Sequence, residues 1–75
     1  MMIVRYRITV SPVDGEPVAI EHFETRTDSD AYWRQLQEDG EDNVLYALPY
    51  RSVVVSYDEF YEGTWVTLNR RVLSR

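Results

Sequence analysis

Hydrophobic and polar residues alternate near both ends of the chain, which is the pattern of half-buried β-strands. Within residues 2–10, every second side chain from Val4 to Val10 is apolar, and the residues between them are Arg or Thr. Residues 18–26 form a second, less regular run of the same type. Prolines and the Asp14-Gly15 pair separate the two runs, which predicts a hairpin with a loop longer than two residues.

One window, residues 28–39, has the features of an α-helix. Thr27 followed three residues later by Asp30 resembles a capping box in which Asp replaces the usual Glu. Acids in the first turn suit the positive end of the helix dipole, and Gly40 suits the position that ends a helix. The helix would pack on a sheet through a narrow apolar stripe, which consists of Tyr32, Trp33 and Leu36.

Three extended segments follow, over residues 44–48, 51–61 and 64–73. Glu62 and Gly63 separate the last two at the spacing of a two-residue hairpin turn. We therefore predict one α+β domain over residues 1–75. It contains a small antiparallel sheet of four to five strands, in the order ββαβββ along the chain, with one helix packed on one face. Residues 2–10 or 64–73 would supply an exposed sheet edge, through which the protein could form a homodimer.

A two-residue turn fixes the pairing of the last hairpin and thereby its two faces. Val53, Val55 and Tyr57 fall on the more apolar face, which we predict to be the core. The opposite face places Phe60 against Trp65 within polar surroundings, a composition typical of protein-binding patches. The predicted partner-binding residues are Phe60, Trp65 and Arg71, surrounded by Asp58, Thr67 and Asn69. The alternative is that both aromatic residues are core, because a one-residue slip would exchange the faces.

Charge is distributed unevenly over the 75 residues, whose formal net charge is −5. Ten acids and two arginines, a net charge of −8, lie between positions 14 and 42. Their densest group predicts an acidic surface formed by Glu38, Asp39, Glu41 and Asp42. This balance disfavours direct nucleic-acid binding, which depends on cationic contacts to phosphates.

No motif for catalysis, a cofactor or a metal is present in the sequence. There is no cysteine, and His22 is the single histidine. Asp28-Ser29-Asp30 begins like a calcium loop, but Trp33 occupies the position that requires glycine. A P-loop is excluded because the chain has no lysine and only three scattered glycines. We therefore predict no enzyme activity, no cofactor and no metal site.

These observations predict a non-enzymatic protein–protein interaction module, with another protein as its partner. Its size and acidity suggest an accessory or inhibitor protein of the phage or mobile-element type. One alternative is an acidic nucleic-acid mimic that occupies a basic groove of its partner. Another is a dimeric small-ligand-binding protein or enzyme with a site between subunits. The absence of cysteine, of a signal peptide and of a long apolar segment predicts a cytoplasmic protein that does not contact a membrane.

Overall fold

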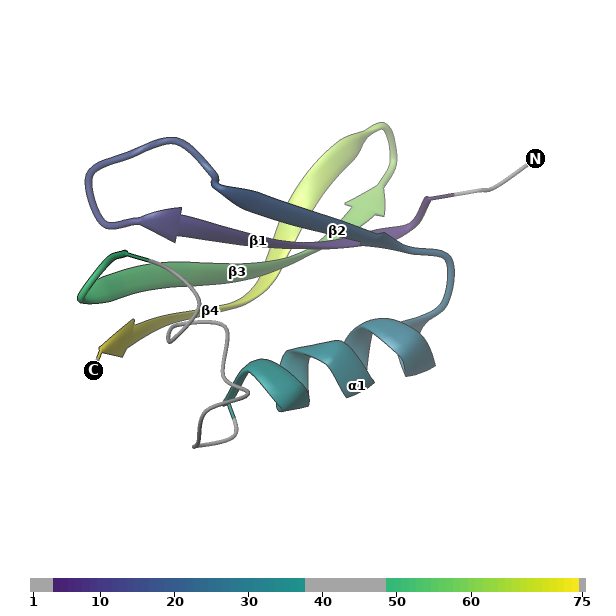
Figure 1. Ribbon diagram of the computed structural model, residues 1–75. Helices are drawn as coiled ribbons and strands as arrows, with labels where there is room; N and C mark the ends of the chain where they lie inside the picture. The colour runs from purple at the N-terminus through teal and green to yellow at the C-terminus, as the bar shows by residue number, and fades with distance from the viewer. Residues whose placement is uncertain (1–3, 38–48, 75) are drawn as a thin grey trace.

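The computed structural model describes residues 4–37 and 49–74, and Figure 1 shows their arrangement. The elements in chain order are β1 (Tyr6–Pro12), β2 (Ala19–Phe23), α1 (Arg26–Gln37), β3 (Ser52–Tyr61) and β4 (Thr64–Ser74). The four strands form one antiparallel sheet in the order β2-β1-β3-β4, and α1 packs on one side of it. The predicted α+β class and the antiparallel sheet are confirmed. The strand predicted at residues 44–48 lies outside the described residues.

The position of β1 differs from the prediction. Its run begins at Tyr6 rather than at residue 2, and it pairs with β2 on one side and β3 on the other. Of the two predicted sheet edges, residues 2–10 are therefore wrong, because β1 is central, whereas residues 64–73 are confirmed, because β4 is an edge strand. Alternation alone could not show that β1 is central, because a strand with one polar side can also lie inside a sheet when no other element covers the polar face of that sheet. The described sheet instead has β2 and β4 as its edges.

The helix begins at Arg26, two residues earlier than predicted. Thr25 precedes the first helical residue, and its Oγ1 accepts a hydrogen bond from the backbone N–H of Asp28 at 3.2 Å. Thr25 is thus the N-cap, and Asp28 occupies the third position of the box. The Thr27–Asp30 pair has the same spacing, but Asp30 instead accepts a hydrogen bond from Tyr57 of β3.

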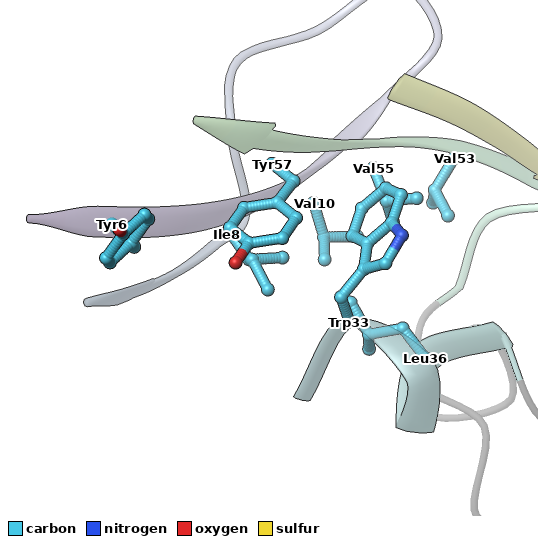
Figure 2. Packing of buried hydrophobic residues seen from close by; sticks show 8 residues of the cluster. All are labelled: Tyr6, Ile8, Val10, Trp33, Leu36, Val53, Val55 and Tyr57. Atoms are coloured by element: carbon cyan, nitrogen blue, oxygen red, sulfur yellow. The ribbon is translucent and has the colours of Figure 1, made fainter. Parts of the chain in front are cut away.

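The hydrophobic core lies between α1 and the sheet (Figure 2). Trp33 and Leu36 extend from the helix toward side chains of β1 and β3. The predicted core face of β3 is confirmed, because Val53, Val55 and Tyr57 are all buried. The strands β1 and β3 are in register here, so their apolar side chains form one continuous layer. That layer is completed by the β1 residues Tyr6, Ile8 and Val10.

A buried chain of hydroxyl groups ties the first turns of α1 to β3. The Ser29 Oγ lies 2.5 Å from the Tyr57 hydroxyl, which in turn donates a hydrogen bond to Asp30 Oδ1 at 2.7 Å. An ionised carboxylate can only accept, so Tyr57 must donate its single proton to Asp30. The Ser29 Oγ also lies within hydrogen-bond distance of the backbone carbonyls of Thr25 and Arg26, at 3.1 Å and 3.0 Å, and its one proton is shared among these contacts. This network joins the helix to the sheet through polar as well as apolar contacts.

The β3–β4 hairpin is regular except at one position. Glu62 and Gly63 have φ angles of 48° and 82°, as a two-residue hairpin turn of type I′ requires, so the predicted turn is confirmed. Pairing proceeds as predicted from Tyr61–Thr64 to Asp58–Thr67, and then shifts by one residue. Leu68 is left without a partner in the ladder. It forms a β-bulge, which bends the strand and increases its twist.

The Tyr57 phenol should make stability fall at alkaline pH. Burial raises its pKa from the ordinary value near 10 to about 12, the bond to Asp30 adds to the increase, and the bond with Ser29 opposes it. The folded state therefore holds this proton more tightly than the unfolded state. The associated stability is fully present below about pH 10 and is lost as the pH rises through about 12.

Urea unfolding between about pH 8 and about pH 11 tests this expectation. The free energy of unfolding of Tyr57→Phe should decline less steeply above about pH 10 than that of the wild type. Tyr61→Phe is the control, since the ring of Tyr61 is exposed. Equal slopes for the wild type and both variants would contradict the assignment.

Candidate functional site

The side of the sheet opposite α1, which we call the free face, is not covered by any described helix or strand. Four residues form a row across it, one from each strand: His22, Arg7, Asp58 and Thr67. Each is the direct cross-strand partner of the next, so their side chains are neighbours on the same face. We call these four residues the polar row.

Asp58 is the centre of the polar row and is only 4% exposed. Its Oδ2 accepts a hydrogen bond from Arg7 Nε at 2.8 Å. Its Oδ1 accepts bonds from the hydroxyls of Ser56 at 2.9 Å and Thr67 at 3.0 Å. A buried carboxylate is costly unless it is paired and hydrogen-bonded, and here both oxygens are satisfied. Asp58 is therefore a structural anion that orients Arg7.

Trp65 lies over this row. The Cζ atom of Arg7 is 4.3 Å from the centroid of the indole ring, within the range of a cation–π contact. The ring of His22 is 6.4 Å from the same indole, although β2 and β4 are opposite edges of the sheet. Three strand spacings on a flat sheet would separate them by about 14 Å. The sheet must therefore curl strongly toward its free face.

The bulge at Leu68 accounts for part of this curl, since bulges increase local twist. Figure 1 shows the β3–β4 turn displaced to the side of the sheet away from α1. The displaced segment includes Trp65, which lies between the bulge and the turn. One extra residue in β4 thus helps to bring an edge-strand side chain over the central strand β1.

The predicted aromatic pair is present on the free face. Phe60 and Trp65 are direct cross-strand partners, with ring centroids 5.2 Å apart in an edge-to-face arrangement. The alternative that both rings belong to the main core is wrong, because Phe60 is 45% exposed and Trp65 is half-buried. Thr67 also lies on this face, as predicted, and Asp58 lies beneath the surface rather than around its rim.

Two of the predicted site residues lie on the opposite side. Asn69 pairs with Tyr57 and Arg71 pairs with Val55, so both belong to the face on which α1 packs. The prediction that Phe60, Trp65 and Arg71 share one face is therefore wrong. The cause is the bulge, which exchanges the two faces for every β4 residue after Leu68. Arg70 and Val72 take their place on the free face, opposite Ser56 and Val54.

Sequence reasoning missed the roles of Arg7 and His22. The period-2 pattern placed Arg7 on the polar face of its strand, but nothing in the sequence joined it to Asp58, 51 residues away. His22 is exposed on β2, and no motif in the sequence distinguishes it from an ordinary strand residue. Only the strand order β2-β1-β3 brings both residues into one row with the carboxylate.

The edge strand β4 exposes large apolar side chains, but it also has features that hinder its pairing with a strand of another chain. Three of its exposed residues are large and apolar, namely Val66, Leu68 and Val72. However, Arg70 and Arg71 place a cation on each face of the strand, and the bulge interrupts its regular ladder. Charges and bulges on edge strands are known to disfavour pairing with another chain. The free face is therefore a better candidate site than the β4 edge.

The predicted acidic surface of Glu38, Asp39, Glu41 and Asp42 lies outside the described residues. Within residues 4–37 and 49–74, no group of three or more acidic or histidine side chains has an arrangement that could hold a metal ion. None of the described helices is long and apolar enough to cross a membrane.

Comparisons with protein families, curated proteins and solved structures gave no match for this chain.

Asp58→Ala should lower the free energy of unfolding by about 2–3 kcal/mol. The substitution removes three hydrogen bonds and leaves Arg7 without its anion, and breaking a buried ion pair is strongly destabilising. The expected loss is below the largest reported values because the Arg7 side chain is 32% exposed and can be hydrated. Chemical denaturation with Asp14→Ala as the control would measure it. Equal stabilities for the two variants would show that Asp58 is not the structural anion.

Replacing both Arg70 and Arg71 by Thr should strengthen self-association. The change removes the cations from the β4 edge and keeps residues that favour strands. Sedimentation velocity over a range of concentrations would detect the shift toward dimers or larger species. The matched control is Arg34→Thr with Arg51→Thr, which removes the same charge from exposed positions outside the strands. If both double variants sediment alike, the arginines do not protect the edge.

Proposed function

We propose that the protein is a non-enzymatic module that binds another protein through the free face of its sheet. The observation that supports this most directly is the Phe60–Trp65 pair, which lies on that face with the Phe60 ring 45% exposed. Aromatic side chains provide a large contact area, and Trp is among the residues that most often dominate binding energy.

The aromatic pair is already held in place before any partner binds. Trp65 contacts Phe60, the guanidinium of Arg7 and the ring of His22. Side chains with few accessible conformations lose little entropy when they are buried at an interface. A preorganised Trp65 therefore supports a role in recognition better than an isolated aromatic residue would.

The rest of the free face has the mixed composition of a protein interface. Ile20 and Val72 are 49% and 61% exposed, and they add apolar area on the two edge strands. Small hydroxyl side chains lie between them on the central strands, at Thr9 and Ser56. Non-obligate interfaces combine apolar anchors with polar groups in this way.

Nucleic-acid mimicry stays a prediction without a specific observation in its favour. Among the described acids between positions 14 and 42, Asp14 and Glu16 precede β2, Glu24 follows it, and Asp28 and Asp30 belong to α1. Glu21 lies within β2 but faces the helix side of the sheet, opposite Ile8. The described carboxylates of this segment are thus divided among the β1–β2 loop, β2, the residue after it and α1.

Affinity capture from the source organism with matched variants tests the proposal. A protein retained by the wild type should be lost with Phe60→Ala and retained with Val13→Ala, whose residue is exposed in the β1–β2 loop. Truncation of an anchor residue costs on the order of 2 kcal/mol, which weakens binding about 30-fold. Thermal melts must show that Phe60→Ala is folded. Retention of the same protein by both variants would contradict binding through this face.

A further inference from the structure

Arg7 and His22 stand side by side on the free face and form a donor-rich spot. They are direct partners in the β1–β2 ladder, where opposing Cβ atoms lie about 4.5–5.5 Å apart. Both side chains reach the indole of Trp65, one through its guanidinium and the other through its imidazole. His22 is exposed, so this spot is open to a binding partner.

The guanidinium of Arg7 is held in one orientation, but not all of its N–H groups are hydrogen-bonded within the described residues. Its Nε donates to Asp58, and one of its surfaces is covered by Trp65. Among the described residues, no acceptor is hydrogen-bonded to its two Nη groups, and the side chain is 32% exposed. Both oxygens of Asp58 are already occupied. The Nη groups are therefore available to a second anion.

Charge on the free face also favours an anion. Arg5 continues the alternation of β1 and is bonded through its backbone to Phe23 and Phe60, while Arg70 lies farther along β4. In the described strands, Asp58 is the one acid on this face, and Arg7 neutralises it. Glu24 directly follows β2 and continues the alternation of His22, as Arg5 continues that of β1. Three arginines against these two acids leave the face with a net charge of +1, although the whole chain has a net charge of −5.

We propose that Arg7 and His22, with Trp65 as a wall, bind a side-chain carboxylate from an acidic segment of the partner protein. This inference rests on the proposed function, because it identifies the chemistry that the free face recognises. A planar carboxylate matches the fork of N–H groups on a guanidinium, and the contact to Asp58 fixes that fork before binding. The neighbouring imidazole supplies an additional N–H donor.

The probe for this site is a capped hexaglutamate peptide, with capped hexaglutamine as its uncharged counterpart. NMR would follow the Arg7 Nε–H and the Trp65 indole N–H during titration at low ionic strength. Hexaglutamate should shift both resonances saturably, and hexaglutamine should not. The second indole, that of Trp33, is in the core between α1 and the sheet and should stay unchanged.

Three variants separate the site from general charge attraction. His22→Ala removes the imidazole donor and should weaken hexaglutamate binding about tenfold or more, as expected for the loss of one hydrogen bond to a charged group. Arg34→Gln, on the exposed surface of α1, should leave binding unchanged. Arg7→Lys keeps the charge beside Asp58 and removes the planar fork, so it should also weaken binding.

The proposal is overturned if hexaglutamate shifts neither resonance, or if His22→Ala and Arg34→Gln weaken binding equally. If that happens while Phe60→Ala still loses the partner, the carboxylate site is wrong and the proposed function stands. In the reverse result, hexaglutamate shifts both resonances, but Phe60→Ala still retains the partner protein. That result supports the carboxylate site and contradicts protein binding through the aromatic pair.

Discussion

The carboxylate of Asp58 imposes the strictest constraint on this fold. It is buried, and it accepts hydrogen bonds from β1, from its own strand and from β4, through Arg7, Ser56 and Thr67. A buried anion that loses such partners is strongly destabilising, so the three strands must meet in one register. A slip of one residue would turn Asp58 to the core side, against α1. The pairing of the central strands and the placement of Trp65 over Arg7 both depend on this register.

Much of the fold could be predicted because its determinants are local. Period-2 patterning identified β1, β3 and β4, and the Glu62-Gly63 pair identified the turn from which the hairpin register could be counted. The bulge at Leu68 could not be predicted, since that residue differs in no obvious way from its neighbours in the strand. The predicted cap at Thr27 is wrong, because Thr25–Asp28 has the same spacing as Thr27–Asp30 and the capping bond forms at Thr25, while Asp30 accepts a bond from Tyr57.

The candidate site, like the fold, could be predicted from the sequence where its contacts are local and not where they join distant segments. Phe60 and Trp65 flank the turn, so counting outward from it was sufficient to place them opposite each other. Arg7 and His22 belong to another hairpin, and their proximity to the aromatic pair depends on which strands become neighbours. Strand order is set by the packing of the whole chain, and no short motif encodes it. A site assembled from all four strands is therefore visible from sequence only in part.

The strand order also determines how the chain can reach its native state. The β1–β2 and β3–β4 pairings each close a short loop, whereas the β1–β3 pairing joins residues about 50 positions apart. Loop closure becomes more costly with length, and hairpins form within about 1–10 μs. The two hairpins can therefore arise early and independently, and their docking along β1 and β3 becomes the slow event in folding. Before docking, the β1–β2 hairpin holds His22 beside Arg7, and the β3–β4 hairpin holds Asp58 beside Ser56 and Thr67. A single late encounter then joins Arg7 to Asp58 and brings the apolar faces of β1 and β3 together.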